Sequence, residues 1–217
     1  MKRAIVSVAF GAVAKGRQCR FIPSFQANAA GADIFNFQEL PKDSPSHEKV
    51  PYAFKAYAIK EVIDQGYDSV LWVDSSIIAN RPLTPLWDFI DQQGYWLVDD
   101  PDGKGGIWNC GQWTCDSALG PLGITREEAF GIPQIASFSF GLNLNNNIAR
   151  KFFSEFWQYA RQGDAFCGPR TTHRHDQTVA SVIAWRLNMK LSPLTDWVHV
   201  YRYDSKDKGS NLLTVWW

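Results

Sequence analysis

The chain has 217 residues, of which 45% are hydrophobic and 20% are charged. This length and composition are enough to bury a substantial core, which excludes a disordered or fibrous chain. The 22 Lys and Arg residues balance the 22 Asp and Glu residues, and a net charge of zero argues against a nucleic-acid-binding protein without excluding it. Ten residues are Trp, and those outside the core are expected to form flat platforms for ring-shaped ligands such as sugars or bases.

The start of the chain allows two interpretations. Lys2 and Arg3 precede the apolar residues 4–14, whose last three residues, Ala-Val-Ala, resemble a signal-peptidase site. The interpretation that we favour is a first buried strand over residues 4–10 that ends at Gly11, because the later motifs need such a strand. The chain has no run of about 18 apolar residues, so we expect no membrane-spanning segment.

The cysteines indicate the compartment. They are Cys19, Cys110, Cys115 and Cys167, and their spacing fits no zinc-binding pattern. Four cysteines in a chain of this length do not make a disulfide framework. We therefore predict free thiols in a reducing compartment and a cytoplasmic location.

Predicted strands and helices alternate along the chain, which is typical of an α/β sheet. In chain order the predicted strands are 4–10, 33–39, 69–73, 95–98, 137–144 and 197–203. The predicted helices are 18–25, 51–66, 84–94, 125–131, 147–162 and 176–187. Between them we predict a loop, a long irregular glycine-rich loop and a tail at 41–45, 101–124 and 209–217. No linker or repeat interrupts the chain, so residues 1–217 are predicted to form one domain.

Two of the predicted buried strands end in carboxylates. Asp74 follows the strand at 69–73, and Asp99 and Asp100 follow the strand at 95–98. Ligands of open α/β sheets bind just beyond the carboxyl ends of the strands, where an Asp can hold a divalent cation against phosphate oxygens. Taken alone, an Asp at a strand end is more often a turn or helix-capping residue.

The order of the motifs is more specific than any single motif. Phe54-Lys55, a helix, Gly66-Tyr67-Asp68 and then the Val-Leu-Trp-Val-Asp-Ser-Ser of residues 70–76 resemble the segment around the metal-binding Asp-x-Asp motif of GT-A-fold glycosyltransferases. Residues 139–145, a helix and then Asp176-Gln177 resemble the segment of that superfamily that lines the sugar pocket.

Two further features resemble the glycogenin-like branch of this superfamily. His199 is similar in place to the His that completes the metal site of that branch. Lys206 and Lys208 lie where that branch has a phosphate-contacting Lys. The resemblance covers roughly residues 3–208, which is nearly the whole chain.

The resemblance implies an α/β protein with the GT-A (Rossmann-like) fold, in which a mixed, mostly parallel central sheet has helices on both faces. It also implies a hexosyltransferase that moves a sugar from a nucleotide-diphosphate sugar to an acceptor hydroxyl. A Mn²⁺ or Mg²⁺ ion would neutralise the diphosphate leaving group. The placement of Asp-Gln and His favours retention, but retention and inversion both stay open. The acceptor is also open: a glycan, a protein, a small molecule or a modified nucleic acid.

The resemblance implies roles for individual residues. The implied metal ligands are Asp74, Ser76 and His199. The residues implied to bind the nucleotide sugar are Ala9, Phe10, Gly11, Arg17, Lys55, Asp74, Ser75, Ser76, Lys206 and Lys208. The residues expected at the sugar hydroxyls or beside the anomeric carbon, and thus at the catalytic centre, are Asp99, Asp100, Asp176 and Gln177. The predicted acceptor platform comprises tryptophans outside regular elements, namely Trp108 and Trp113, with Trp216 and Trp217 in the tail.

Ser76 departs from the family pattern, which has a second carboxylate two residues after Asp74. A Ser hydroxyl brings no charge and is therefore a poorer cation ligand. Three interpretations follow. Ser76 binds the cation through a water, with His199 and the nucleotide supplying the rest; or the cation is weakly held and Lys or Arg residues neutralise the phosphates; or the site has lost catalysis.

Simpler interpretations stand beside these assignments. His199 also fits a strand histidine packed on its neighbours, and Lys55 also fits a surface charge. The His-Arg-His-Asp run at 173–176 also fits a solvated helix start. By their spacing in the predicted helices and strands, Trp72, Trp157 and Trp185 fit core positions.

Two other functions are compatible with the same motifs. A non-catalytic nucleotide- or glycan-binding module on the same fold would explain Ser76. A nucleotidyltransferase would share the sheet and the strand-end Asp, and residues 11–17 are a reduced version of the glycine-rich, basic loop that such an enzyme has after its first strand.

Overall fold

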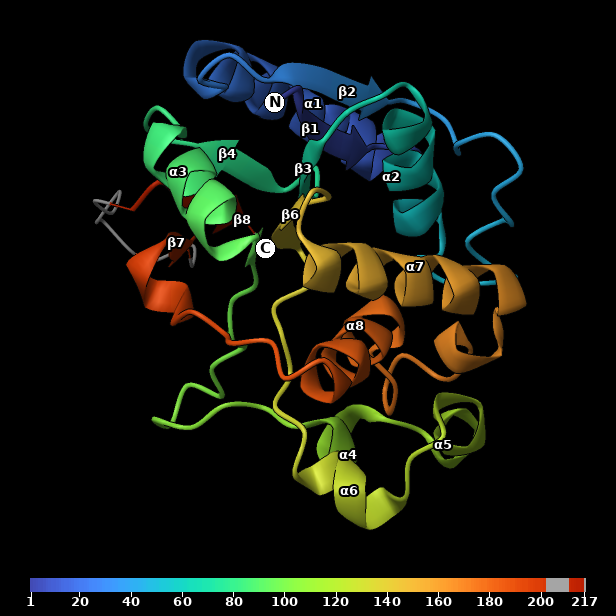
Figure 1. The fold of residues 1–217 in the computed structure, drawn as a ribbon. Coiled ribbons are helices and arrows are strands. Elements are labelled where there is room, and N and C mark those ends of the chain that lie inside the picture. The colour runs from blue at the N-terminus through green and yellow to red at the C-terminus, as the bar shows by residue number, and fades with distance from the viewer. Residues whose placement is uncertain (202–210, 217) are drawn as a thin grey trace.

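The computed structural model describes residues 1–201 and 211–216, without the side chains of residues 12–15, 17, 18, 200, 201 and 216 (Figure 1). Five strands form the central sheet. They are β1 (Arg3–Val8), β2 (Asp33–Phe37), β3 (Ser69–Val73), β5 (Tyr95–Trp96) and β6 (Ser139–Asn143). Their order across the sheet is β2-β1-β3-β6-β5.

The central sheet is mixed. Strand β1 pairs in parallel with β2 and β3, whereas β6 runs antiparallel to its neighbours β3 and β5. The prediction of a mixed, mostly parallel sheet is confirmed, because four of these five strands run in the same direction and β6 runs against them. All residues of β6 are buried. A strand that is buried on both faces has no polar alternation, so its sequence does not show its direction.

Helices cover both faces of this sheet, as predicted (Figure 1). The helices of one face are α2 (Phe54–Asp64), α7 (Asn147–Gln162) and α8 (His175–Arg186). The helices of the other face are α1 (Ala12–Asn28) and α3 (Thr84–Gln93). Strand β1 serves both cores, because Ala4 and Val6 face the first and Ile5 faces the second. Gly141 of β6 lets α3 pack closely, since a Cβ there would lie 2.4 Å from the Ile90 side chain.

A second, smaller sheet joins the core on the α1 and α3 side. Its strands are β4 (Ile77–Ala79), β7 (Val198–Tyr201) and β8 (Leu213–Trp216), in the order β4-β8-β7. The prediction that residues 209–217 form a tail is wrong, because β8 lies within them and Leu213 and Val215 are fully buried. Such a short segment becomes a strand through its pairing with β4 and β7, which local sequence does not show.

Short helices replace much of the loop predicted at 101–124. They are α4 (Cys110–Trp113) and α5 (Asp116–Leu122), and with α6 (Arg126–Phe130) they form a lobe at one end of the molecule (Figure 1). The prediction of an irregular loop is therefore wrong beyond residue 109. Asn109 and Gln112 form a capping box at the start of α4, and the predicted capping box of Thr125 and Glu128 is confirmed at α6.

Other element boundaries differ more modestly from the predictions. Helix α1 is longer than the predicted 18–25, because Gly16 and Pro23 within it are poor helix formers that obscure its length. Strand β5 is shorter than the predicted 95–98. Two 3-10 helices, Asp164–Phe166 and Leu194–Asp196, complete the described elements. No helix in the described part of the chain is both long and apolar enough to cross a membrane.

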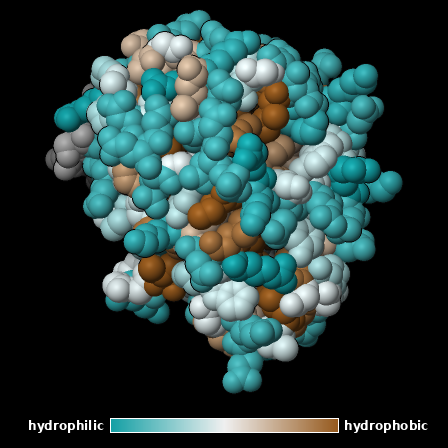
Figure 2. All heavy atoms as spheres, viewed as in Figure 1, coloured by the Kyte–Doolittle hydropathy of each residue, from teal (hydrophilic) through white to brown (hydrophobic). Residues whose placement is uncertain are grey.

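The tryptophans divide between core and surface. Trp72 is buried and Trp157 packs against the core, as predicted. Trp185 is 41% exposed, so its predicted core position is wrong. Figure 2 shows a largely hydrophilic face, on which hydrophobic side chains gather around α8 and the lobe of α4 and α6. That residues 1–217 form one domain stays a prediction.

Candidate functional site

A cleft of about 450 Å³ lies where the ends of several elements meet. Tyr52 and Lys55 enter it from the start of α2, and Asp74 enters it directly after β3. Further lining residues come from the segment between β5 and α5, from residues 136–138 before β6, and from residues 170–177 at the start of α8. The cleft thus lies beyond the carboxyl end of β3, where ligands of α/β sheets bind.

A buried lysine joins two carboxylates in this cleft. Lys55 Nζ lies 3.0 Å from Asp74 Oδ1 and 2.9 Å from Asp176 Oδ2. It also donates a hydrogen bond of 3.0 Å to the carbonyl oxygen of Ser137. The ammonium therefore has two ion-pair partners and one hydrogen-bond acceptor, and the Lys55 side chain is only 2% exposed. Because these residues come from α2, from the end of β3 and from α8, the lysine centre ties three elements together.

The charges of this lysine centre depend on one another. Burial by itself lowers the pKa of Lys55, but the charges of Asp176 and Asp74 outweigh burial, so the pKa is raised and the ammonium stays charged. Burial raises the pKa of Asp74, and Lys55 and the Trp72 indole N–H oppose this rise. Asp176 Oδ2 receives no hydrogen bond of ordinary geometry from the described residues, so the Lys55 ammonium is the charge partner of that oxygen.

Asp100 is the third carboxylate of the cleft. Its Oδ2 accepts a hydrogen bond of 2.6 Å from Gln177 Nε2. Burial raises the pKa of Asp100 to about 6, while the hydrogen bond from Gln177 and the charge of Arg174 lower it. A carboxylate with a pKa close to neutral pH exchanges its proton readily, which suits a general acid or base.

The raised pKa of Asp100 predicts a pH dependence of stability. Between the ordinary Asp pKa of 3.8 and about 6, the folded protein binds more protons at Asp100 than the unfolded chain does. The Asp100 contribution to the free energy of unfolding therefore falls as the pH rises through this window. We expect Asp100→Asn to remove this decline, which urea unfolding at a series of pH values measures.

Asp102 provides a control of opposite sign. Backbone hydrogen bonds from Lys104 and Gly106 lower its pKa, so its contribution to stability is lost as the pH falls. Asp102→Asn is expected to remove a contribution to the free energy of unfolding that increases as the pH rises. An Asp100→Asn profile parallel to that of the wild type would contradict the prediction.

Two tryptophans and two arginines form another part of the lining. The Trp108 and Trp113 rings meet edge to face, with 5.4 Å between their centroids. The Arg174 guanidinium lies 3.7 Å from the centroid of the Trp113 ring and donates a hydrogen bond of 2.7 Å to the Arg170 carbonyl. In the described part of the chain, neither arginine has a carboxylate partner within 4.0 Å. Their charges are therefore free to meet an anionic ligand.

The backbone is strained on either side of the lysine centre. Tyr52 and His175 adopt left-handed conformations with φ of 61° and 45°, and their ring centroids are 5.6 Å apart. Such conformations cost about 1–3 kcal/mol for a residue with a side chain, and they concentrate at functional sites. Nearby, burial lowers the pKa of His173 to about 4, so this imidazole is neutral at pH 7.

The structure brings many of the predicted site residues together. Those that line the cleft are Lys55, Asp74, Asp100, Trp108, Trp113, Asp176 and Gln177. They come from segments that are far apart in the sequence, so their convergence supports the prediction of a shared site. The individual roles of these residues stay predictions.

Other predicted site residues do not line the cleft. They are Ala9, Phe10, Gly11, Ser75, Ser76, Asp99 and His199. Asp99 Oδ1 accepts a hydrogen bond of 2.8 Å from the Leu194 N–H and so holds the 3-10 helix at 194–196. Phe10 packs edge-on against His47 and Phe54. Lys206, Lys208 and Trp217, and the side chains of Arg17 and Trp216, lie outside the described part of the structure.

The predicted ligands of Mn²⁺ or Mg²⁺ do not form one donor set. Asp74 lines the cleft, but Ser76 and His199 do not. Strand pairing places His199 of β7 beside Thr214 of β8, which in turn pairs with Ile78 of β4, so His199 belongs to the second sheet. Its Nε2 is buried without a partner among the described residues, but away from the cleft lining.

The chemistry of the cleft also fits a divalent cation poorly. Asp74 Oδ1 already has two N–H donors, from Lys55 and Trp72. The described residues contain no group of three or more His, Cys, Asp or Glu side chains arranged to hold a metal ion. Mg²⁺ and Mn²⁺ need several oxygen ligands around one point. The residues present therefore do not fit the predicted metal, and no chemical step is assigned to it.

Several cleft residues were not predicted as site residues. They are Tyr52, Arg170, His173, Arg174 and His175. The sequence does contain a signal for four of them, because the basic run at 170–175 directly precedes Asp176-Gln177. Tyr52 has no such signal, since its position depends on the left-handed turn that leads into α2.

The fold is similar to that of a glycosyltransferase of known structure. That crystal structure is described as a glycosyltransferase involved in the glycosylation of the major capsid of PBCV-1. The two chains superpose with a TM-score of 0.60 and 13% sequence identity, over 99% of this chain and 92% of the other. No protein-family model and no curated protein matches the sequence. At this identity the likeness establishes a glycosyltransferase-like fold and nothing further about chemistry.

Proposed function

We propose that this protein is a glycosyltransferase that moves a sugar from a nucleotide-diphosphate sugar to an acceptor hydroxyl. The bond between the anomeric carbon and the diphosphate oxygen breaks, and the diphosphate leaves with the bonding electrons. The acceptor oxygen bonds to the anomeric carbon and gives up its proton. Such a reaction needs positive charge near the diphosphate, a group that accepts the proton, and a surface that holds the acceptor.

The lysine centre of Lys55, Asp74 and Asp176 is the observation that carries this proposal. Burying the Lys55 ammonium and the Asp176 carboxylate is costly, and the cost is offset here by two ion pairs and one hydrogen bond to the ammonium. The centre lines an open cleft at a strand end, where fixed charges meet an entering polar ligand. The fold supports the same reaction class, because it is shared with a glycosyltransferase.

Asp176 and lining residues outside the lysine centre supply the remaining requirements of the reaction. We assign Asp176 and Gln177, at the start of α8, to the hydroxyls of the donor sugar. Asp100 is assigned to the proton of the acceptor hydroxyl, because its raised pKa makes it a suitable base. The edge-to-face pair of Trp108 and Trp113 is assigned to the acceptor, since aromatic rings bind the apolar faces of sugars.

Several earlier predictions remain untested beside this proposal. Mn²⁺ or Mg²⁺ assistance, hexosyl specificity and retention are among them. The cytoplasmic location also stays a prediction, which the four unpaired cysteines support.

Incubation with a panel of nucleotide-diphosphate sugars tests the proposed reaction. We expect at least one donor to be hydrolysed slowly to free sugar and nucleoside diphosphate, because water replaces an absent acceptor in the same cleft. The panel is run with Mn²⁺, with Mg²⁺ and with a chelator, and chromatography of the nucleotide products measures turnover.

Each other outcome indicates a different function. A folded protein that neither binds nor hydrolyses any donor contradicts the proposal. Tight nucleotide binding without turnover favours a non-catalytic binding module, as Ser76 suggested. Release of pyrophosphate from a nucleoside triphosphate favours a nucleotidyltransferase.

A further inference from the structure

The Lys55 ammonium of the lysine centre lies where three oxygen atoms converge. Lys55 Nζ lies within 3.0 Å of two carboxylate oxygens and one carbonyl oxygen, from Asp74, Asp176 and Ser137. Carboxylate and carbonyl oxygens are the ligands that hard divalent cations prefer. The ammonium therefore occupies the point at which these oxygens converge, and it balances part of their negative charge.

This resident ammonium disfavours a divalent cation at the same point. A metal ion bound to Asp74 would lie close to Lys55 Nζ, and the two positive charges would repel each other. The Lys55 side chain is 2% exposed, and two ion pairs and one hydrogen bond hold its ammonium at this point. Without Lys55, by contrast, Asp74 and Asp176 would repel an incoming diphosphate.

The cleft also contains positive charge that is not already paired. Arg170 is exposed, and the Arg174 guanidinium lies over the Trp113 ring, 3.7 Å from its centroid. Among the described residues, neither has a carboxylate within 4.0 Å. A planar guanidinium forms paired hydrogen bonds to phosphate oxygens, and stacking on Trp113 fixes the orientation of one of the two. Both arginines line the same cleft as the lysine centre.

We propose that Arg170 and Arg174 bind the diphosphate of the nucleotide sugar without a divalent cation, and that Lys55 takes the place of the metal ion. This inference rests on the proposed glycosyl transfer and deepens it. As the anomeric carbon–oxygen bond breaks, the guanidinium groups neutralise the negative charge that develops on the leaving diphosphate. The bond that breaks, the bond that forms and the proton that leaves the acceptor are those of the proposed reaction.

Calorimetric titration of nucleoside diphosphates tests this inference without turnover. The probes are UDP, GDP, ADP, CDP and dTDP, each added to the full chain in EDTA and again in Mn²⁺. We expect at least one of them to bind with the same affinity in both buffers. Mn²⁺ titrated alone is expected to give no saturable binding at millimolar concentrations.

Arginine variants connect this binding to the two residues. Arg170→Ala and Arg174→Ala are each expected to weaken the binding in EDTA about 10-fold or more, which is the usual effect of losing one charged hydrogen bond. Arg170→Lys is expected to recover part of the lost affinity, because Lys restores the charge but not the paired hydrogen bonds of a planar guanidinium. The matched control is Arg161→Ala, which removes an exposed arginine from the last turn of α7. Thermal unfolding of each variant tests whether it remains folded.

The possible results separate this inference from the function on which it rests. Binding in EDTA that is lost in the Arg170 and Arg174 variants supports it. Binding that requires Mn²⁺, or binding in EDTA that both variants retain, overturns it and leaves the proposed glycosyl transfer standing. Failure of all five probes in both buffers, with hydrolysis of no donor in the panel, overturns the proposed function as well.

Discussion

Replacing Lys55 with Met is expected to destabilise the protein by about 3–5 kcal/mol and to abolish glycosyl transfer. Met keeps most of the side-chain volume but removes the charge, which leaves Asp74 and Asp176 facing each other without a cation. Burial already raises the pKa of Asp74, and the ammonium of Lys55 opposes that rise. In Lys55→Met this pKa is therefore expected to rise further.

The pH dependence of this destabilisation identifies its cause. A carboxylate whose folded pKa lies above its unfolded pKa reduces stability above the folded pKa, and the penalty is relieved as the pH falls through it. The difference in the free energy of unfolding between wild type and Lys55→Met is therefore expected to shrink toward acid pH. Urea unfolding at several pH values measures this difference.

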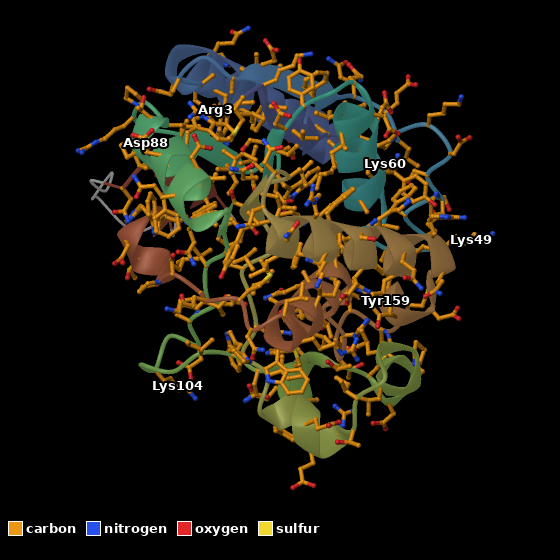
Figure 3. The ribbon with its side chains drawn as sticks, in the orientation of Figure 1. Arg3, Lys49, Lys60, Asp88, Lys104 and Tyr159 are labelled. Atoms are coloured by element: carbon orange, nitrogen blue, oxygen red, sulfur yellow. The ribbon has the colours of Figure 1, made fainter. Side chains whose placement is uncertain are left out.

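Lys60→Met is the matched control, on the same helix. Lys60 forms an ion pair with Asp64 on the exposed surface of α2, where Figure 3 labels it. Exposed ion pairs four residues apart contribute about 0.5 kcal/mol or less. Equal losses of stability in Lys55→Met and Lys60→Met would show that the lysine centre does not hold α2, β3 and α8 together.

Replacing Asp74 with Ala is expected to lower turnover of the nucleotide sugar by about 100-fold or more, the usual effect of removing one preorganised charge from a catalytic site. The expected loss does not depend on a metal ion, because Asp74 positions the Lys55 ammonium through a contact of 3.0 Å. The fold is expected to persist, since Lys55 keeps Asp176 and the Ser137 carbonyl as partners.

One further variant separates charge from shape at this position, and a second variant on the surface is the control. Asp74→Asn keeps the shape and an oxygen acceptor but removes the charge, so we expect a loss of turnover similar to that of Asp74→Ala. Asp88→Ala removes an exposed carboxylate from α3, labelled in Figure 3, and is expected to leave turnover unchanged. Wild-type turnover in a folded Asp74→Ala protein would remove Asp74 from the site.

Much of the site was predictable from the sequence because its residues follow strong local signals. An apolar strand that stops at Asp74 predicts a carboxylate at the sheet edge. The same reasoning placed Asp100 after β5, and the Asp176-Gln177 pair was placed at a helix start by its motif. These residues converge in the cleft because strand ends and helix starts meet at one edge of an α/β sheet.

The predicted donor set for a metal ion shows where this reasoning stops. Asp74 and Ser76 are close in sequence, but a short turn after β3 sends only Asp74 into the cleft. The place of His199 depends on the register of β7 against β8, and β8 was itself predicted as a tail. Register between distant strands depends on pairing and burial, which neither segment encodes alone.

By itself, the sequence determined the α/β class, the main helices, the strands that deliver carboxylates, and the identity of Lys55 and of the carboxylates that meet in the cleft. These follow from local periodicity and from the ends of apolar runs. Only the tertiary structure decided that β6 is antiparallel, that β8 completes a second sheet, and that Lys55 sits between Asp74 and Asp176 while Arg170 and Arg174 remain unpaired by the described carboxylates. The physical reason is that pairing of strands and of buried charges depends on distances between segments far apart in the chain, and these distances exist only once the core has packed.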